Sequence, residues 1–359
     1  MGTGHVMRGL TLANALAAKG ATCAFLCKEH PGHLLGLIQS HGHAVHALGV
    51  TSDTHGQTAA DHSGPALKHA DWLGTTQQQD WQDCQPHVQS MAPDWLVVDH
   101  YAIDMRWEQA AKALGNRLMV IDDLADRAHV CDLLLDQTFG RDPLAYAHWT
   151  PASCDLLCGA KYALLRPEFA ALRSASLARR ATSSPKQVLV SMGGVDLDNA
   201  TGLTLDAIQT SQLPRDCQVT VVMGATAPWI DTIKRKAATL TYPCAVKTDV
   251  RDMATLMANA DLAIGAAGAT SWERCCLGLP SIMVVLADNQ RQAAQALTQA
   301  HAALCLDMGE DFVGQLREAI NQLVDDPGLM RGLGIEAARI IDGKGCDRVV
   351  ATMSQHLHH

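Results

Sequence analysis

Several features that would direct the interpretation of this 359-residue sequence are missing from it. No stretch approaches the roughly 20 apolar residues that a membrane-spanning helix needs, and no basic-then-apolar run at the start indicates a signal peptide. Positive charge is also scarce, because 28 Lys and Arg stand against 37 Asp and Glu, a formal net charge of −9. Nucleic acids and anionic membranes are bound by clustered cations. We therefore expect a soluble, cytoplasmic protein with neither kind of partner.

Metal-binding patterns are missing as well. The twelve cysteines include no C-x-x-C pair, the close pairing that structural zinc sites usually contain. His41, His43 and His46 straddle the end of an expected helix and the start of an expected strand, so three ligands would not converge easily. We expect free thiols, no metal site and no cofactor.

The sequence does contain many apolar residues, 48% of the total against 18% charged residues. This is enough to form the buried cores of two domains. Short β-branched or apolar runs alternate with helical patterns, which favours an α/β fold with two Rossmann-like domains built on parallel sheets. Predicted strands cover residues 22–27, 44–48, 94–99, 117–122, 132–136, 188–191, 218–223, 245–248, 262–264, 282–286 and 303–306. Helices are predicted between them, among them 7–19 and 31–41.

Breaks in this alternation predict the domain boundaries. Residues 173–186 are rich in Ser, Ala and Arg and contain Pro185, which is typical of a linker. They would separate an N-terminal domain of residues 1–172 from a C-terminal domain of residues 187–342. Residues 343–359 are expected to form a helix that packs back on the N-terminal domain, and the polar residues 51–75 to form a surface loop.

The chain opens on a glycine-containing segment, Gly2-Thr3-Gly4-His5, that runs directly into a helix. Glycines let the backbone approach a ligand, and a helix N-terminus offers free N–H groups. A neutral imidazole at this turn can take a proton near pH 7; an exposed histidine beside an ordinary turn is the alternative. Such a glycine loop normally follows a buried strand, but here the loop begins at Gly2. The first strand of this domain is therefore expected to be missing.

A second glycine segment, Gly265 to Glu273, lies between a predicted strand and a helix. Gly268, Ala269 and Thr270 would stand at the helix N-terminus, where backbone amides bind a diphosphate. The Glu273 carboxylate, about one turn into the helix, can accept hydrogen bonds from both hydroxyls of a ribose. A solvated helix residue is the alternative.

Polar residues also follow two other strands of the C-terminal half. Asn289 lies after the strand at 282–286, where side chains at the carboxyl end of a parallel strand face the ligand crevice; it could equally be a helix N-cap. Gly194, in Ser191–Asp196, would bring backbone amides to the same crevice, or form a plain turn.

In the N-terminal half, Asp99, His100 and Tyr101 lie at the end of one predicted strand, and Asp122 and Asp123 end the next. These side chains could orient a sugar or hold a catalytic base. Buried aspartates that cap neighbouring loops are the commoner outcome, so His5 is the stronger candidate for the base.

Together these segments resemble one family, the UDP-2,4-diacetamido-2,4,6-trideoxy-β-L-altropyranose hydrolases of pseudaminic acid biosynthesis, which is similar in fold to two-domain B-type glycosyltransferases whose domains face across a cleft. The resemblance extends in collinear order over nearly the whole chain. The matching segments are G-T-G-H-V-M-R at 2–8, D-H-Y at 99–101, V-I-D-D-L-A-D-R at 120–127, S-M-G-G-V-D at 191–196, G-A-A-G-A-T-S-W-E at 265–273 and A-D-N-Q at 287–290.

The resemblance implies a division of labour between the domains. The C-terminal domain would bind UDP and the N-terminal domain would hold the sugar, while water attacks the anomeric carbon with inversion and without a metal. His5 matches the catalytic base, Glu273 and Asn289 match substrate-binding positions, and Tyr101 matches a tyrosine that lines the sugar site. The substrate-binding backbone positions are expected to be Gly4, Gly194, Gly268, Ala269 and Thr270.

Two departures from the family pattern stand out. The strand before the first glycine segment is missing, which bears on the position of His5, and Gly9 stands where a larger helix residue is expected. Two alternatives to a UDP-sugar hydrolase therefore stay open. One is a glycosyltransferase that passes the sugar to an acceptor, and the other is an inactive nucleotide-sugar binder.

Overall fold

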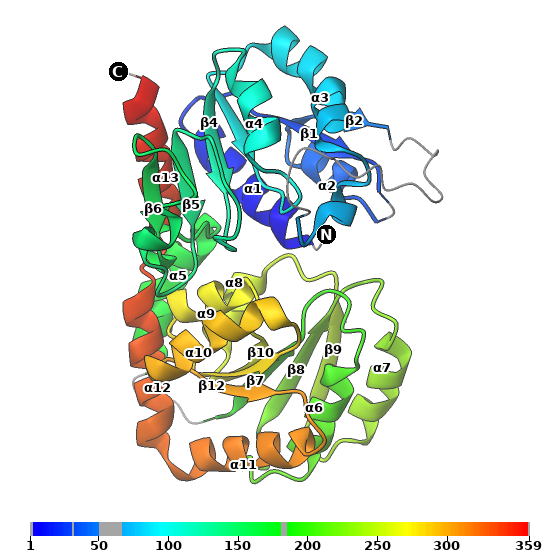
Figure 1. Ribbon diagram of the computed structural model, residues 1–359. Coiled ribbons are helices and arrows are strands. Elements are labelled where there is room, and N and C mark those ends of the chain that lie inside the picture. Colours follow the sequence, from blue (N-terminus) through cyan, green and yellow to red (C-terminus); the bar gives the residue numbers. More distant parts are fainter. Residues whose placement is uncertain (1–2, 31, 50–66, 181–184, 358–359) are drawn as a thin grey trace. The chain divides into compact units, whose positions relative to one another are not determined.

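The computed structural model describes residues 3–30, 32–49, 67–180 and 185–357. The chain divides into two compact units (Figure 1). The N-terminal unit comprises Met1–Leu164 and Gly345–His359, and the C-terminal unit comprises Leu165–Lys344. Each unit has the α/β architecture with parallel sheets that the alternating sequence pattern predicts.

The N-terminal unit contains two parallel sheets. Its strands are β1 (Ala24–Lys28), β2 (Ala44–Leu48), β3 (Trp95–Val98), β4 (Arg117–Ile121), β5 (Leu133–Asp136) and β6 (Asp155–Cys158). Its helices are α1 (Thr3–Ala17), α2 (Leu35–Ser40), α3 (Gln77–Met91), α4 (Met105–Lys112) and α13 (Gly345–Leu357), with short 3₁₀ turns at η1 (Ala70–Leu73), η2 (Pro143–Tyr146) and η3 (Ala160–Tyr162).

The division of these strands is unusual for a Rossmann-like unit. Strands β1 and β2 form one sheet and β3, β4, β5 and β6 form another. Leu26 and Leu48 of the first sheet nevertheless pack into the same apolar cluster as Val98 and Leu118 of the second. Among the described residues no strand pairs with the outer edge of β1 or of β3. The two sheets therefore share a core without sharing a hydrogen-bonded ladder.

Helix α1 packs beside helix α13 within this unit (Figure 1). Leu12 of α1 joins Val349 and Met353 of α13 in one apolar cluster. The indole Nε1 of Trp95 also donates to the backbone oxygen of Met353 at 3.2 Å. These contacts bring the last helix of the chain onto the first.

Gly9 lies inside α1, where a methyl group would sit 3.5 Å from the Phe25 ring, an ordinary van der Waals distance. Glycine weakens a helix interior because it loses more backbone entropy than alanine on folding. Gly9→Ala should therefore raise the free energy of unfolding by about 0.5–1 kcal/mol, measured by urea denaturation. Gly20→Ala is the matched control, because the φ of +92° at Gly20 makes alanine strained there. Equal effects at both positions would contradict the argument.

The C-terminal unit is built on one six-stranded parallel sheet in the order β12-β11-β10-β7-β8-β9. Its strands are β7 (Gln187–Ser191), β8 (Gln218–Met223), β9 (Cys244–Thr248), β10 (Leu262–Ala266), β11 (Ser281–Val285) and β12 (Leu304–Asp307). Its helices are α5 (Pro167–Arg180), α6 (Ala200–Gln209), α7 (Ile230–Thr239), α8 (Met253–Asn259), α9 (Thr270–Cys276), α10 (Arg291–Gln299), α11 (Phe312–Asp325) and α12 (Pro327–Ile340), with the 3₁₀ turn η4 (Asp288–Gln290).

The order of these strands places a topological switch point between β7 and β10. Chain order runs outward from β7 through β8 and β9 on one side, and from β10 through β12 on the other. Helices α6 and α11 pack against one face of the sheet, whereas α8 and α9 contact β7 and β10, as Figure 1 shows. In open parallel sheets a ligand crevice lies outside the carboxyl ends of the strands at such a switch point.

The predicted strands agree with the observed ones at 44–48 and 218–223, and the other predicted strands differ by one or two residues at their ends. Strand β6 was not predicted, because its apolar run is very short. Helix α1 begins at Thr3 rather than Met7, so Gly4 and His5 lie in its first turn. Gly2, Pro31 and residues 51–66 of the predicted loop lie outside the described residues.

The predicted linker at 173–186 was wrong for its first part. Residues 173–180 complete helix α5, because Ala and Arg are strong helix formers. Two of the arginines are also anchored: Arg173 Nη2 donates to the oxygen of Ala338 at 2.7 Å, and Arg180 Nη2 to the oxygen of Ala260 at 2.8 Å. Residues 181–184 lie outside the described part of the chain.

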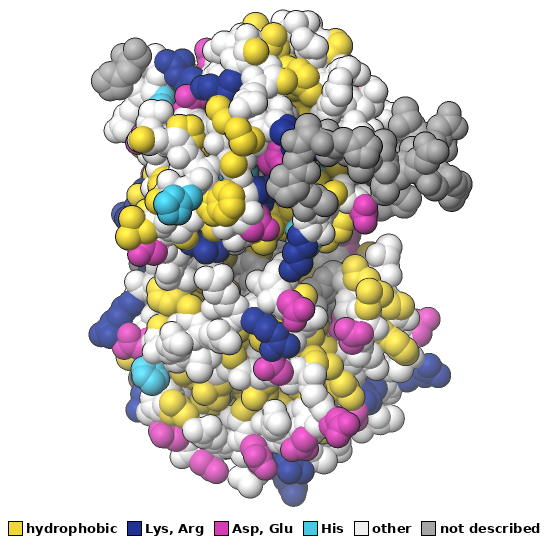
Figure 2. Space-filling model, in the orientation of Figure 1, with side chains coloured by type: hydrophobic (Ala, Val, Ile, Leu, Met, Phe, Trp, Pro, Cys, Tyr) yellow, Lys and Arg dark blue, Asp and Glu magenta, His cyan; other side chains and the backbone are white. Residues whose placement is uncertain are grey.

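Three further features are the distribution of surface charge, the state of the cysteines and the length of the helices. In Figure 2, acidic and basic side chains are mixed over the face in view, and the described residues there form no continuous basic patch. None of the twelve cysteines, all of which lie in the described residues, forms a disulfide bond. None of the helices in the described residues is long and apolar enough to cross a bilayer.

Candidate active site

His5 is held by a carboxylate in the N-terminal unit. Its Nδ1 lies 2.6 Å from Oδ1 of Asp99, the residue that follows β3. The side chains are only 11% and 14% exposed. An ionised carboxylate can only accept a hydrogen bond, so the Asp99 contact places the proton of a neutral His5 ring on Nδ1, which Arg8 Nη2 also approaches to 3.1 Å. Nε2 is then the ring nitrogen with a free lone pair.

Arg8 completes this arrangement one helical turn further along α1. Its Nε donates to Asp99 Oδ2 and its Nη2 to Asp99 Oδ1, both at 2.6 Å, while Nη1 donates to Asp123 Oδ2 at 3.1 Å. Burial alone would raise the pKa of Asp99, but the Arg8 guanidinium and the His5 hydrogen bond outweigh it and lower that pKa. Asp99 is therefore ionised at neutral pH, as a partner for the imidazole requires.

Tyr101 is the second candidate that the fold brings to His5. The two ring centroids are 4.7 Å apart in an edge-on arrangement. Tyr101 is 7% exposed, and burial together with the Asp123 carboxylate raises the pKa of its phenol. The hydroxyl therefore stays protonated near neutral pH and serves as a hydrogen-bonding group rather than as a base.

His100, which lies between these two residues, has a different role. Burial, and next the charge on His5, lower the pKa of His100 to about 4. Its Nδ1 accepts a hydrogen bond from the backbone N–H of Ala102 at 3.0 Å. This side chain therefore supports the loop after β3 and is a poor candidate for a base near pH 7.

The two aspartates that end β4 separate into different environments. Asp123 faces Arg8. Asp122 is fully buried, where Oδ2 accepts from the Tyr146 hydroxyl at 2.9 Å and Oδ1 pairs with Arg127 Nη1 at 2.7 Å. Asp122 thus has the loop-supporting role that the sequence suggests for such aspartates, while Asp123 belongs to the cluster around His5.

The three histidines at 41–46 do not converge. His43 Nε2 lies 2.8 Å from Asn14 Oδ1 and His41 Nδ1 lies 3.3 Å from Asn14 Nδ2. The His46 ring instead packs against His87, with centroids 4.9 Å apart. No group of three potential metal ligands occurs among the residues that the structure describes.

In the C-terminal unit, turns after adjacent strands lie together at the carboxyl edge of the sheet. A side chain at Gly224, after β8, would come within 2.0 Å of the Gly194 oxygen, after β7. The backbones of these two turns are therefore in contact. After β10, Gly268 lies beside the Gln290 amide of the turn after β11, 3.8 Å from where a Cβ would stand. These turns flank the switch point between β7 and β10.

Glu273 lies in the first turn of α9, beside this glycine turn. Its Oε1 pairs with Arg166 Nη2 at 3.3 Å, and its side chain is 16% exposed. Burial raises the pKa of Glu273, an effect that Arg166 partly offsets. Arg166 was not predicted from the sequence, because its partner is 107 residues away along the chain.

One sequence expectation about this edge needs correction. Asn289 is exposed in η4, and the N-cap of α10 is Gln290 rather than Asn289. The Gln290 side chain closes the turn by accepting from the Leu286 N–H at 2.9 Å, which leaves the Asn289 amide to solvent or a ligand. In the turn after β7, the Asp196 carboxylate accepts from the N–H groups of Ala200 and Thr201 at 2.8 and 3.0 Å, so these two amides in the first turn of α6 are already paired.

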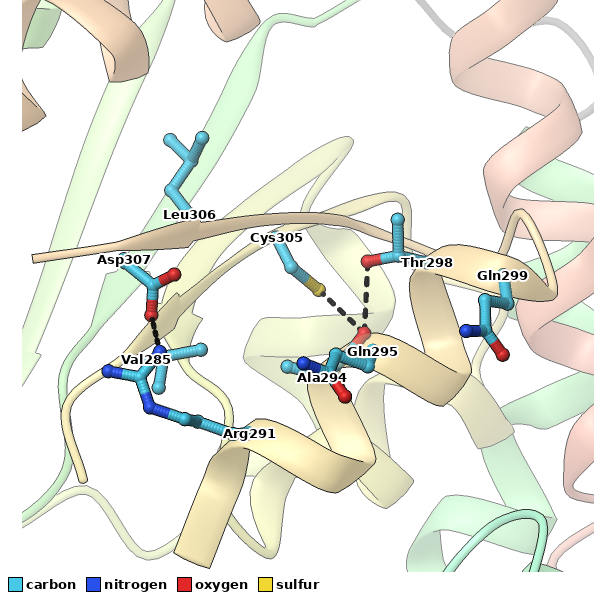
Figure 3. A pocket seen from close by; sticks show the side chains of 9 residues that line it. All are labelled: Val285, Arg291, Ala294, Gln295, Thr298, Gln299, Cys305, Leu306 and Asp307. Carbon is cyan, nitrogen blue, oxygen red and sulfur yellow. Dashed lines mark hydrogen bonds and ion pairs between the residues drawn. The ribbon is translucent and has the colours of Figure 1, made fainter. Parts of the chain in front are cut away.

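A separate cavity in this unit does not coincide with the candidate residues. It lies between α10 and β12 and is lined by side chains that already bind one another (Figure 3). Arg291 Nη1 pairs with Asp307 Oδ1 at 2.6 Å, and both Thr298 Oγ1 and Cys305 Sγ donate to the oxygen of Ala294. The side chains of Gln295 and Gln299 also line it.

Comparison with known proteins identifies the fold of this chain. Residues 190–329 match the glycosyltransferase family 28 C-terminal domain. The crystal structure of Acinetobacter baumannii MurG matches over 99% of this chain and 97% of that one, with a TM-score of 0.69 and 17% identity. This chain has the glycosyltransferase-B fold. The range that matches family 28 contains Gly194, Gly268 and Glu273, while at this identity the structural likeness bears on the fold alone.

Curated relatives match at lower coverage. The chain is 28% identical over 197 residues to the spore coat polysaccharide biosynthesis protein SpsG of Bacillus subtilis, covering 54% of this chain and 57% of that protein. It is 27% identical over 143 residues to a UDP-2,4-diacetamido-2,4,6-trideoxy-β-L-altropyranose hydrolase of Campylobacter jejuni, covering 40% and 48%. The matches span about half the length of these relatives.

Proposed function

We propose that this protein hydrolyses a UDP-linked 2,4-diacetamido-2,4,6-trideoxyhexose to the free sugar and UDP, by inverting attack of water at C1. The N-terminal unit would hold the sugar and the general base, and the C-terminal unit would hold UDP. Support for the sugar comes from the resemblance to the hydrolases of pseudaminic acid biosynthesis and from the partial match to the Campylobacter jejuni enzyme.

The observation that carries the proposal is the fixed orientation of His5. The Asp99 carboxylate accepts a hydrogen bond from Nδ1 of His5 and two hydrogen bonds from the Arg8 guanidinium. A carboxylate that fixes the tautomer of a histidine and stabilises the imidazolium is the arrangement of a general base.

The reaction follows from this tautomer. Nε2 of His5 takes a proton from a water molecule as the water oxygen forms a bond to C1 of the sugar. On the opposite face the bond between C1 and the diphosphate oxygen breaks, and UDP leaves with the electron pair. UDP is a good leaving group, so a second, protonated carboxyl group is not required. No metal takes part in the proposed step.

The nucleotide side of the proposal rests on the turns at the carboxyl edge of the C-terminal sheet. Backbone amides around Gly268, Ala269 and Thr270 would bind the diphosphate, and Gly194 and Asn289 would line the same crevice. Glu273 would accept hydrogen bonds from the ribose hydroxyls. In the N-terminal unit, Gly4 would leave space for the ligand beside His5, since no atom lies within 4 Å of a Cβ placed there.

The direct test is to incubate the chain with candidate UDP-sugars, without acceptor or metal, and to follow free sugar by NMR. The expected product is released with inverted configuration at C1. Release of UDP only when an acceptor is added would instead favour a glycosyltransferase, which the family 28 domain supports as a second candidate. Tight UDP binding without turnover of any of these sugars would favour the inactive binder.

Glu273→Ala should weaken UDP binding by about tenfold or more, because removing the carboxylate removes about 1–3 kcal/mol of hydrogen bonding to the two ribose hydroxyls. Calorimetry measures the UDP affinity of each variant. Glu168→Ala is a matched control. Glu168 also pairs with Arg166, at 3.2 Å, but its side chain is 42% exposed. Equal loss in the two variants would mean that Glu273 acts only through Arg166, and unchanged UDP affinity would remove the ribose assignment.

A further inference from the structure

An aromatic cluster that reaches the surface at Trp72 lies next to His5 in the N-terminal unit. The rings of His69 and Trp72 stand 4.4 Å apart, and each packs against Tyr101, at 5.6 and 5.9 Å between centroids. Tyr101 in turn contacts His5. The indole of Trp72 is therefore one aromatic ring away from the imidazole.

Trp72 is exposed although it is held in place. The residue is 37% exposed, while its neighbour Leu73 is 4% exposed and belongs to the core cluster of the unit. The 3₁₀ turn η1 that carries both residues leads into α3, whose N-terminus is capped by Thr76 accepting from the Gln79 N–H at 3.1 Å. A large aromatic side chain that is both anchored and exposed is typical of a binding surface.

The chemistry of the cluster is that of an apolar wall. Burial and the nearby Lys68 lower the pKa of His69, so its ring is neutral at pH 7. The faces of aromatic rings carry partial negative charge, and the C–H bonds of a pyranose ring, a methyl group and an acetamido methyl carry partial positive charge. Such groups stack on aromatic faces, whereas hydroxyl groups lose hydration there without gaining partners.

We infer that Trp72, with His69 and Tyr101, forms a stacking platform that selects sugars with a large apolar surface over fully hydroxylated hexoses. This inference rests on the proposed function, because it places the sugar beside His5. It names side chains in a segment, residues 67–76, to which neither the glycine motifs nor the resemblance assigns a role. The platform would act on the binding of the sugar and not on the chemical step.

The test measures binding without turnover. In a His5→Asn background, calorimetry compares UDP with UDP-N-acetylglucosamine and with a UDP-linked 2,4-diacetamido-2,4,6-trideoxyhexose. Trp72→Ala should weaken binding of the trideoxy sugar nucleotide about tenfold, the value of one or two aromatic contacts, and leave UDP affinity within about twofold. Trp72→Phe should retain most of the affinity, and Leu144→Ala, a residue 75% exposed in the same unit, should change nothing.

The outcomes separate the platform from the proposed reaction. An equal loss for the trideoxy sugar nucleotide and for either UDP or UDP-N-acetylglucosamine would overturn the platform, whatever the turnover of the wild-type chain. No loss for the trideoxy sugar nucleotide would overturn it as well. A tenfold loss confined to the trideoxy sugar nucleotide, together with no free sugar released by the wild-type protein, would support the platform and reject the hydrolase. In an active wild-type background, Trp72→Ala should raise KM with little change in kcat.

Discussion

His5→Asn should lower kcat for UDP-sugar hydrolysis on the order of 10²–10⁴-fold, the usual contribution of a general base, while UDP affinity stays nearly constant. Asparagine keeps a hydrogen-bonding group near Asp99 but has no nitrogen that takes a proton at neutral pH. Steady-state turnover followed by UDP release, and UDP binding by calorimetry, give the two quantities.

His148→Asn is the matched control for this substitution, because His148 is an exposed histidine of the same unit and lies outside the cluster around Asp99. It should leave both quantities unchanged. If His5→Asn lowered UDP affinity as strongly as turnover, the histidine would have a structural role, and the proposed mechanism would fail.

Asp99→Asn should lower kcat by a similar factor, on the order of 10²–10⁴, although Asp99 does not touch the substrate in the proposed mechanism. The side-chain amide introduced by this substitution would donate to Nδ1 of His5, so the ring proton would move to Nε2. The nitrogen that should accept a proton would then already carry one. Turnover assays at neutral pH measure the loss.

A double variant distinguishes this positioning role from an independent one. Since both residues act through the same nitrogen, His5→Asn combined with Asp99→Asn should be no slower than His5→Asn alone. If the double variant instead lost kcat by the product of the two single losses, Asp99 would contribute by a separate route, such as holding Arg8 for a contact with the ligand.

The same carboxylate predicts the acid stability of the protein. The folded-state pKa of Asp99 lies below its usual value, so its ion pair stabilises the fold above the unfolded pKa of about 3.9. This stabilisation is lost as the pH falls through the lower folded-state pKa. The Tm of Asp99→Asn should therefore fall less steeply than that of the wild type below about pH 5.

Local patterns in the sequence predicted most strands, because a strand buried in a parallel sheet is a short apolar run bounded by turn residues. Strand β11 at residues 281–285, which is buried at every position, is of this kind. The same reasoning failed at residues 173–180, where a Ser- and Ala-rich composition suggested a linker. The helix there is stabilised by arginine contacts to backbone oxygens such as that of Ala260, 80 residues away.

The candidate site shows the same division between local and distant information. Glycine turns and strand ends pointed to His5, Tyr101 and Glu273 as candidates. Arg8 was visible only as part of a matched motif, because its partner Asp99 is 91 residues distant. Asp99 and Asp123 could not be separated from Asp122 by sequence, since all three lie at the ends of predicted strands and only packing decides which one is fully buried.

The sequence by itself determined the α/β class, the approximate strands and the residues from which a site could be built, since these depend on apolar periodicity, glycine turns and the chemistry of individual side chains. The tertiary structure alone decided that Asp99 fixes the ring of His5, that Arg166 pairs with Glu273, and that Trp72 is exposed beside Tyr101. Each of these contacts joins residues far apart in the chain or depends on burial, and neither property is written in a local pattern.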